Sequence, residues 1–460
     1  MLLEWIFYKI EFYFLKFKGS KNKINFQGVL MGFDWYLEFI DLNYKPSKTD
    51  LVCEFRVDPA RGFSMKEAAG RVASESSTGT WTTLYKLPPR EKKLMATAFD
   101  IKGNFVKVAY PIDLWEPGNA PQLLSGIAGN IFGMKALKGL RLMDVSLPKE
   151  YLKHFKGPSH GIEGIRKMMK VKKRPLTGAV PKPKIGYSAL EHAKIGFETW
   201  MGGFDIVKDD ENLTSTSFNK FEQRVKLMTK ERERAERLTG EKKSAFLNIT
   251  GETNEMIRRA TLLHDLGWEF AMIDVVTSGT AAVQTLRDVC GDLELAIHAH
   301  RAMHAAFDRN YEQGITMYFL GKIMRMIGVD EIHVGTAVGK LVGTRYEVKH
   351  IADMLRERHI PLEGKEILEQ NWYHIKPVFP VSSGGLHPGL VPEVMKILGT
   401  QCVLLVSGGI HGHPNGTRQG AKATMQAIQA SMEGVSIFEY AKKHKELALA
   451  LKKWGTTSPI

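Results

Sequence analysis

The chain of 460 residues is 43% hydrophobic and 25% charged, and its formal net charge at pH 7 is +14. Its length accommodates two domains, and its composition is that of a globular protein, which excludes the disordered and fibrous classes. The positive charge suits either a nucleic acid or a small anionic substrate, because a basic surface attracts phosphate. The lysine-rich stretch over 166–184 lacks the interleaved aromatic residues of a single-strand binding surface, so we expect no nucleic-acid partner.

Residues 1–30 form an atypical N-terminal extension, whose apolar run is interrupted by Glu4, Lys9 and Glu11. The run is too short and too charged to span a membrane, and no small-residue cleavage site follows it as in a signal peptide. An amphipathic surface anchor is one interpretation, and a non-native extension before a start at Met31 is the one we favour. We expect no membrane association and no role in function.

Residues 31–165 mix strand and helix patterns, which predicts an N-terminal α+β domain. Apolar and polar residues alternate in the strand-like runs, and Ser64 with Glu67 forms a capping-box pattern at the start of a helix. We predict strands over 51–60 and 104–115, a helix after Ser64, and a helical stretch interrupted by glycines over 120–140.

The cysteines Cys53, Cys290 and Cys402 lie far apart and in no metal-binding or redox spacing. This pattern argues against a disulfide framework and against a zinc site. We therefore expect a reducing, cytoplasmic location.

From residue 166 a basic connector leads into a regular pattern, in which short apolar runs end in polar residues and recur eight times. Helical stretches such as 254–267 and 317–330 lie between these runs and close on glycine, as helix ends often do. Eight strand-then-helix units predict an α/β fold, a (β/α)₈ barrel over 166–460 with further helices at its C-terminal end. The eight runs are 177–184, 203–211, 244–250, 269–276, 294–301, 331–336, 378–385 and 402–409.

In such barrels the chemistry takes place at the C-terminal ends of the strands, so this rim is where we expect the active site. A lysine or histidine at one strand end is usually a solvated or packing residue, but many of them share this rim. The polar residues at the strand ends are Lys182, Lys184, Lys208, Asp210, Glu211, Asn248, Asp274, His300, Arg301, His333 and Ser383.

The second run places Lys208 against Asp209, Asp210 and Glu211 at the end of a buried strand. Three adjacent carboxylates repel, and one ammonium does not neutralise them all. Asp210 and Glu211 offer the hard oxygen ligands that Mg²⁺ prefers, but an ammonium at Lys208 would compete with the ion. Lys208 fits better as a neutral or an anionic group, and a surface salt-bridge cluster is the alternative.

Two glycine-rich turns, 382–389 and 407–416, follow the seventh and eighth strands. Glycines let backbone N–H groups approach an anion, and these turns are a common phosphate site in barrels. The cationic residues His300, Arg301 and His333 lie on the opposite side of the rim from these turns. Two separated anion sites suggest a substrate with a phosphate at each end. The loop 335–343 carries Lys340 between glycines, as expected either for a loop that closes over substrate or for an exposed loop.

With these pieces placed, the chain resembles the large subunit of ribulose-1,5-bisphosphate carboxylase/oxygenase (RuBisCO) from Met31 to Trp454. It is most similar to the form II/III and form III enzymes of archaea and candidate phyla. The motifs that carry the resemblance are ESSTGTW (75–81), GNIFG (129–133), PKPKIG (181–186), GGFDIVKDDEN (202–212), HAHRAMHAAF (298–307), GTAVGKL (335–341) and SSGG (382–385).

The resemblance implies that Lys208 is carbamylated by a non-substrate CO₂ and binds Mg²⁺ with Asp210 and Glu211, while Asp209 does not ligate. It implies that this carbamate takes the C3 proton of ribulose 1,5-bisphosphate, and that CO₂ or O₂ then adds at C2 with Lys340 steadying the new carboxylate. His300 would assist hydration at C3. The two molecules of 3-phosphoglycerate would form after Lys182, whose pKa is tuned by Lys184, protonates the remaining carbanion.

The resemblance also implies two phosphate sites and a shared active site. The N-terminal residues would reach the barrel of a second subunit, which makes a homodimer, or a multiple of dimers without a small subunit, the expected assembly. The implied substrate-binding residues are Glu75, Thr80, Trp81, Asn130, Arg301, His333, Ser383, Gly384, Gly385, Ser407, Gly408 and Gly409.

Two departures from the family pattern stand out. Ser407 replaces the first of three glycines common in relatives, and its side chain is expected to crowd a phosphate. Val180 replaces a threonine of the plant-type enzymes, which bears on gas selectivity. The subgroup suggests a role in the salvage of nucleoside monophosphates.

Two alternatives remain at this stage. One is a RuBisCO-like enolase or isomerase that does not fix CO₂, although such proteins usually lack residues equivalent to Glu75, Asn130 or Lys340. The other is a basic nucleic-acid-binding or scaffold protein, which leaves the lysine and acids at the rim unexplained.

Overall fold

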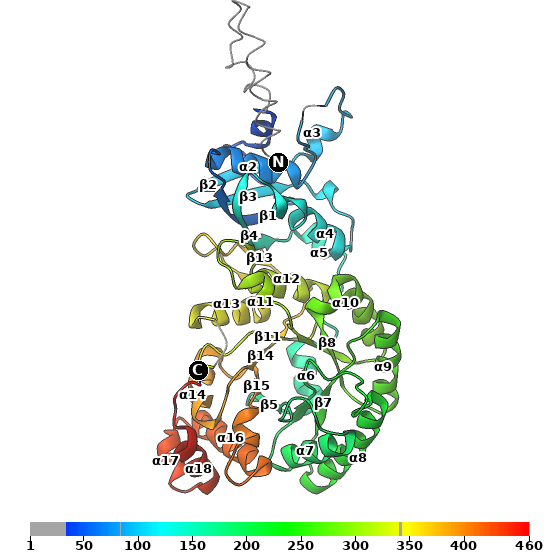
Figure 1. Cartoon of the computed structure of the whole chain (residues 1–460), viewed down its shortest axis with the longest axis vertical. Helices are drawn as coiled ribbons and strands as arrows, with labels where there is room; N and C mark the ends of the chain where they lie inside the picture. The colour runs from blue at the N-terminus through cyan, green and yellow to red at the C-terminus, as the bar shows by residue number, and fades with distance from the viewer. Residues whose placement is uncertain (1–33, 83, 340–342, 460) are drawn as a thin grey trace, which may run out of the picture.

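The computed structural model describes residues 34–82, 84–339 and 343–459, and it places an N-terminal domain at one end of a larger barrel (Figure 1). The predicted extension 1–30 and Lys340 lie outside the described residues. No helix in the described part of the chain is both long and apolar enough to cross a membrane.

The N-terminal domain is built on a five-stranded sheet with the order β10-β4-β1-β3-β2. β10 (Gly314–Ile315) comes from the barrel region and pairs parallel to β4, so the sheet itself ties the two parts together. The other elements are η2 (Asp34–Phe39), β1 (Leu51–Pro59), α2 (Met65–Glu75), α3 (Glu91–Leu94), β2 (Thr97–Lys102), β3 (Phe105–Tyr110), η3 (Ile112–Leu114), α4 (Ala120–Ile127), η4 (Asn130–Gly133), β4 (Leu137–Ser146) and α5 (Lys149–Leu152).

The sequence predicted this domain well at its start and less well at its end. Ser64 caps α2 with the reciprocal bonds of a capping box, as predicted. The predicted strand over 104–115 stops at Tyr110, because Pro111 follows and has no N–H for the ladder. The predicted helical stretch over 120–140 is wrong at its end, where Leu137 begins β4 and pairs with β1.

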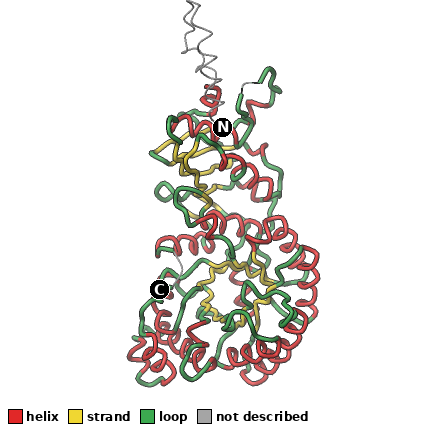
Figure 2. Tube along the Cα trace, in the orientation of Figure 1, coloured by secondary structure: helices red, strands yellow, loops and turns green. Residues whose placement is uncertain are grey.

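The barrel is a closed ring of eight parallel strands in the order β11-β14-β15-β5-β6-β7-β8-β9 (Figure 2). Each of the eight predicted runs contains one of these strands or, for β5, all but its first residue, so the predicted fold class is confirmed. The strands are β5 (Leu176–Ala179), β6 (Ile206–Lys208), β7 (Ser244–Asn248), β8 (Phe270–Asp274), β9 (Ala296–His300), β11 (Glu331–His333), β14 (Phe379–Ser383) and β15 (Val403–Leu405).

Helices surround the ring, and α6 (Gly161–Met169) packs Ile165 and Met169 against the apolar interior of the barrel. The division between domains at 165 and 166 stays a prediction. The remaining elements are α7 (Ala189–Met201), α8 (Phe221–Thr239), α9 (Thr253–Asp265), α10 (Val275–Asp292), α11 (Ala305–Asp308), α12 (Met317–Ile327), α13 (Arg345–Arg356), β12 (His359–Ile360), β13 (Gln370–Asn371), η5 (Pro388–Leu390), α14 (Val391–Leu398), α15 (Gly408–His411), α16 (Thr417–Met432), α17 (Ile437–Ala441) and α18 (Lys445–Trp454).

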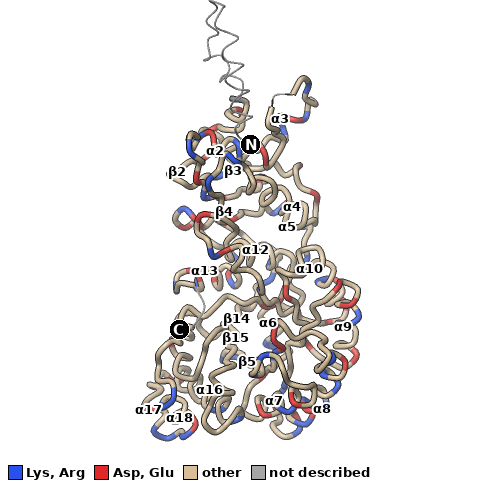
Figure 3. The backbone as a smooth tube through the Cα atoms, viewed as in Figure 1, with Lys and Arg blue, Asp and Glu red and all other residues tan. Residues whose placement is uncertain are grey.

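Charged side chains of both signs alternate over the outer helices. Figure 3 shows lysine and arginine interspersed with acids along α8 and α9. On these helices Arg258, for example, forms ion pairs with both Glu222 and Glu255. Such a mixed surface does not favour the nucleic-acid-binding alternative.

Candidate active site

The rim of the barrel gathers the polar side chains that end its strands. Alternate residues of a strand point to the same side, so the last residue of each strand and the one two before it face the barrel interior. This places Lys208, Asn248, Asp274, His300, His333 and Ser383 together at the C-terminal ends of β6, β7, β8, β9, β11 and β14.

Lys208 is buried, with 1% of its surface exposed, and its Nζ donates a hydrogen bond to the carbonyl of Asp209 at 2.8 Å. Burial lowers the pKa of this amine, because the charged form loses its hydration, while Glu211 and Asp210 act in the opposite direction. The net lowering favours a neutral amine, which is a nucleophile.

Asp209 points away from the rim and is occupied by other partners. Arg224 lies 3.0 Å from one carboxylate oxygen and His192 lies 3.1 Å from the other. Although burial raises the pKa of Asp209, Arg224 and His192 together lower it to about 2. This carboxylate therefore accepts hydrogen bonds from Arg224 and from the backbone of Asn248, which ties the ends of β6 and β7 together away from the rim.

Asp210 and Glu211 face the rim instead. Asp210 accepts hydrogen bonds from Asn212, and its other oxygen lies 3.3 Å from Lys182 Nζ. Glu211 lies 3.6 Å from His300 Nε2, and His300 Nδ1 lies 3.1 Å from an oxygen of Asp274. Within the described residues no group of three His, Cys, Asp or Glu side chains forms a metal site.

The donor set nevertheless fits Mg²⁺ if Lys208 becomes anionic. Mg²⁺ prefers oxygen ligands and uses few protein carboxylates, and Asp210 and Glu211 supply two of them. A carbamate on the buried amine of Lys208 would supply the third and would remove the competing positive charge. The residues present therefore fit the ion.

The two lysines after β5 are placed differently from each other. Lys182 reaches Asp210, as described above. Lys184 is exposed, and no hydrogen bond or ion pair joins its side chain to another described residue. The predicted influence of Lys184 on the pKa of Lys182 stays a prediction.

Arg301, His333 and Ser383 form a cationic and polar group on the opposite side of the rim. Arg301 is 8% exposed and has no hydrogen bond or ion pair to any described side chain, and burial lowers its pKa to about 10. His333 Nδ1 lies 2.7 Å from Ser383 Oγ. A buried guanidinium without a partner is suited to bind an anion.

The glycine turns beside this group have the backbone that a close anion requires. Gly384 and Gly385 have φ values of +117° and +78°, which side chains rarely adopt. A Cβ at Gly339 would collide with the carbonyl of Gly384, so the loop that precedes Lys340 starts against this turn.

Ser407 does not have the surroundings that the sequence suggested. Its hydroxyl accepts a hydrogen bond from the backbone N–H of Val180 at 2.9 Å, so it is turned toward β5. Beyond it, a Cβ at Gly408 would meet no atom within 4 Å, whereas a Cβ at Gly409 would meet His387 at 2.4 Å. The expected crowding of a phosphate by Ser407 is therefore not supported by this hydrogen bond.

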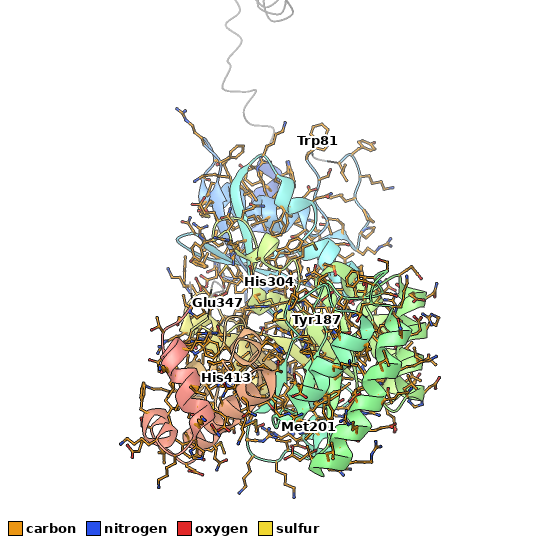
Figure 4. The ribbon with its side chains drawn as sticks, turned by 60° about the horizontal axis from the view of Figure 1, so that its bottom comes forward. Trp81, Tyr187, Met201, His304, Glu347 and His413 are labelled. Carbon is orange, nitrogen blue, oxygen red and sulfur yellow. The ribbon has the colours of Figure 1, made fainter. Side chains whose placement is uncertain are left out.

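The four N-terminal residues of the predicted site lie apart from the rim. Glu75 and Asn130 are exposed, Thr80 is half-buried and Trp81 is 74% exposed. Figure 4 shows Trp81 at the far end of the N-terminal domain, away from Tyr187 and His304 of the barrel. Within one chain the structure does not bring these four residues to the rim.

A cavity of about 480 Å³ adjoins the Arg301 side of the rim, near the labelled His304 and Glu347 in Figure 4. Its lining includes Arg141 of β4 and Tyr346 of α13, and it does not include Lys208, Asp210 or Glu211. The cavity thus lies at the junction of the two domains, beside the anion-binding group.

Two polar residues below the rim, His298 and Glu331, were missed by the sequence interpretation. His298 Nδ1 lies 2.9 Å from Glu331, and His298 Nε2 lies 3.0 Å from His333 Nε2. Both residues stand two positions before a rim histidine on their strands. The period of two along β9 and β11 is the signal that could have found them.

Comparison with known proteins gives consistent matches over most of the chain. Residues 161–454 match the family model described as ribulose bisphosphate carboxylase large chain, catalytic domain, and residues 38–151 match the N-terminal domain of the same chain. The chain is 53% identical to the ribulose bisphosphate carboxylase of Pyrococcus abyssi over 433 residues, which are 93% of this chain and 99% of that protein. It is 50% identical to the enzyme of Archaeoglobus fulgidus over 438 residues, 93% of this chain and 99% of that one.

Two solved structures are similar throughout. The octameric enzyme of Pyrococcus horikoshii, in complex with sulfate, has 52% identity and a TM-score of 0.86, covering 92% of this chain and 97% of its own. The dimeric enzyme of Hyperthermus butylicus has 48% identity and a TM-score of 0.87, covering 92% of this chain and 100% of its own.

Proposed function

The chain belongs to the ribulose bisphosphate carboxylase large-chain family, and we propose that it carboxylates ribulose 1,5-bisphosphate at the rim of its own barrel. The observation that carries this assignment to particular residues is the buried amine of Lys208 beside the carboxylates of Asp210 and Glu211. A carbon–carbon lyase of this kind needs a centre where a proton leaves carbon and negative charge collects on oxygen.

Activation begins at Lys208. Its neutral amine adds to the carbon of a non-substrate CO₂, an N–C bond forms, and a proton leaves the nitrogen, so that the side chain becomes an anionic carbamate. The low pKa of the buried amine supports this step, because only the neutral form reacts. When bound to this carbamate, Asp210 and Glu211, Mg²⁺ would act as a Lewis acid toward the oxygens of the substrate.

The neighbouring side chains then handle protons and position the substrate. His300 lies close to both Asp274 and Glu211, accepts a hydrogen bond at Nδ1 from the backbone N–H of Ala302, and is placed to assist hydration at C3. Lys182, next to Asp210, is placed to protonate the carbanion left by C–C cleavage. Lys184 as a modulator of Lys182, and Lys340 as the residue that steadies the new carboxylate, remain proposals from the family pattern.

The two ends of the substrate bind at two anion sites. Arg301, His333 and Ser383 would hold one phosphate. The backbone N–H groups of the glycine turns, at Gly384 and Gly385 and at Gly408 and Gly409 with Ser407 behind them, would hold the other together with Thr80 and Trp81 of a second subunit. CO₂ or O₂ would then add at C2 of the substrate, which lies between the two bound phosphates.

A homodimer is the smallest complete unit in this proposal. Trp81 lies at the far end of the N-terminal domain, and Glu75 and Asn130 are exposed, so a second chain would have to bring these N-terminal residues, with Thr80, to the rim. Relatives are described as dimeric and octameric, which supports dimers or multiples of dimers without a small subunit. The three buried, unpaired cysteines support a cytoplasmic location, and a role in nucleoside monophosphate salvage is proposed from the subgroup alone.

The proposed function is tested by counting fixed, radiolabelled CO₂ with ribulose 1,5-bisphosphate and Mg²⁺. Lys208→Ala should reduce incorporation to background, and Lys172→Ala, which alters an exposed lysine of the connector, should leave it unchanged. Equal incorporation by native protein and Lys208→Ala would remove Lys208 from the mechanism. Exchange of the C3 hydrogen with solvent but no incorporation by the native protein would favour the enolase or isomerase alternative.

A further inference from the structure

Among the described residues, the apolar cluster inside the barrel below the rim surrounds one buried acid and one buried histidine. Its side chains include Ile206, Phe246 and Met272, in a cluster that fills the ring. Glu331 and His298 lie among them, and each has 0% of its surface exposed. Polar groups in such a core are costly unless they are hydrogen-bonded, so their arrangement needs a reason.

These two residues begin a line of hydrogen bonds that ends at the anion-binding group. Glu331 Oε2 lies 2.9 Å from His298 Nδ1, and His298 Nε2 lies 3.0 Å from His333 Nε2. His333 Nδ1 lies 2.7 Å from Ser383 Oγ. The ring of His298 is stacked on Phe246 with centroids 3.8 Å apart, which fixes its plane.

The line can be polarised in only two directions, because a neutral imidazole has one N–H and one acceptor nitrogen. If the Glu331–His298 pair holds one proton beyond the neutral imidazole, His298 donates to His333 and His333 donates to Ser383. The hydroxyl of Ser383 is then free to donate to an anion. If that proton is absent, every bond reverses, and Ser383 gives its hydrogen to His333 and turns lone pairs to the anion.

The surroundings favour the protonated pair. The second carboxylate oxygen of Glu331 has no hydrogen-bond partner, and no lysine or arginine among the described residues lies within ion-pair distance of it. Burial raises the pKa of Glu331 well above its usual range, and the neighbouring Asp330 adds to this effect. The proton placed on this pair is therefore hard to remove.

The other charged groups near the line act on the histidines. Burial lowers the pKa of His298 and of His333 well below the usual range, and Lys208 and His300 lower both further. Arg301 has the same effect on His333. Burial and these cations thus disfavour the charged form of either ring, which favours Glu331 as the site of the extra proton.

We propose that Glu331 is a positioning residue that acts through His298 and His333 to make the hydroxyl of Ser383 a hydrogen-bond donor to a phosphate of the substrate. The inference rests on the proposed function, since it takes Ser383 as part of a phosphate site. It extends that function because one buried proton would set the direction of every hydrogen bond in the line from Glu331 to Ser383.

The test compares Glu331→Gln with Glu331→Met. The amide of glutamine donates to His298 Nδ1 as a protonated carboxyl does, but it does not titrate, whereas methionine neither donates nor accepts there. Met272→Leu is the matched control, because Met272 is buried in the same apolar interior and makes no side-chain hydrogen bond. Affinity for ribulose 1,5-bisphosphate is measured by calorimetry on protein without Mg²⁺ or added CO₂, so that activation at Lys208 does not enter.

Glu331→Gln and Met272→Leu should keep the native affinity at neutral pH, and Glu331→Met should weaken it about tenfold, as expected for one hydrogen bond to a charged group. As pH rises through the raised pKa of Glu331, the native protein should lose affinity relative to Glu331→Gln. Nitrogen-15 NMR should show the N–H of His298 on Nε2 in the native protein and in Glu331→Gln.

Ser383→Ala separates the two possible failures. If Ser383→Ala leaves the affinity unchanged, the phosphate does not bind there and that part of the proposed function is wrong. If Ser383→Ala weakens binding while Glu331→Met does not, the phosphate site stands and the role of Glu331 is refuted. An N–H of His298 on Nδ1 in the native protein, or the same pH dependence in the native protein and Glu331→Gln, would also refute it.

Discussion

The barrel rim and the N-terminal part of the proposed site differ in burial and in hydrogen bonding. Lys208, Asp209 and His333 are buried and held by hydrogen bonds within their own chain. Trp81 and Glu75 are exposed and make no side-chain hydrogen bond with another described residue. The comparison teaches that one chain holds the charged residues of the rim by itself, whereas in the proposed function the N-terminal residues act only on the barrel of a second chain.

Mixing two inactive variants tests this division most strongly. Lys208→Ala alters only the barrel half and Glu75→Gln only the N-terminal half, so each homodimer should have almost no carboxylase activity. Random reassociation makes half of the dimers mixed, each with one intact site, so about a quarter of the native activity should return. The activity is measured before and after dissociation and mixing.

A mixture that stays inactive, although chain exchange is shown by labelled subunits, would place both halves of the site in one chain. Each variant subjected to dissociation and reassociation alone is the control. Neither control should gain activity.

Removing the partner of a buried charge should show how much the ion pairs behind the rim contribute to the free energy of unfolding. Arg224→Met leaves the carboxylate of Asp209 buried without its arginine, which should lower the free energy of unfolding by about 3–5 kcal/mol. Denaturant unfolding measures this change. Lys226→Met on the same helix is the control, because Lys226 is exposed.

Trp81→Ala applies the same stability measurement to the N-terminal part of the proposed site. Because the side chain is 74% exposed, its loss should change the free energy of unfolding by less than about 0.5 kcal/mol, while carboxylase activity falls. A large loss of stability in this variant would mean that Trp81 packs within its own subunit. The comparison between the two regions would then fail.

Activation by CO₂ should depend on pH in a direction set by the rim. The pKa of Lys208 in the folded protein lies below its ordinary value because of burial, and the reactive form is the neutral amine. The neutral fraction therefore grows as pH rises toward that pKa, so preincubation with CO₂ and Mg²⁺ should activate the enzyme faster at alkaline than at neutral pH. The initial rate, assayed at one fixed pH after preincubation at several, measures this effect.

Activation that slows as pH rises would contradict a requirement for the neutral amine. A preincubation without CO₂ at each pH is the control. It shows whether the protein itself loses activity at the higher pH.

The sequence predicted the barrel well because most of its strands are short, mainly apolar runs, and polar residues stand at or just after their ends. It predicted the rim for the same reason, since strand ends bring distant residues such as Lys208 and His300 together. It failed at Leu137, where a pattern that reads as helix is recruited as a strand by pairing with β1. Long-range pairing of this kind leaves no local signal.

The direction in which polar side chains turn was also beyond the sequence. Asp209 and Asp210 are adjacent acids, but only the structure shows that Arg224 and His192 occupy the first. His298 and Glu331 were overlooked because the hydrogen bond between them joins two different strands, so neither residue shows its partner in the sequence. The contact of Ser407 with Val180 depends on the neighbouring strand and could not be read from either residue.

Ser407→Gly has the smallest expected effect on substrate binding, and it tests the contact between the last strand of the barrel and β5. The hydroxyl of Ser407 is the acceptor for the backbone N–H of Val180, so its loss should lower the free energy of unfolding by about 1–2 kcal/mol. Because the hydroxyl is engaged with β5 and Gly408 faces open space, affinity for ribulose 1,5-bisphosphate should stay within about twofold of native. Thermal unfolding and calorimetry measure the two quantities, with Ser407→Ala as a control that removes the hydroxyl and keeps a Cβ. A clear rise in affinity in Ser407→Gly, but not in Ser407→Ala, would show that the Cβ of Ser407 obstructs the phosphate after all.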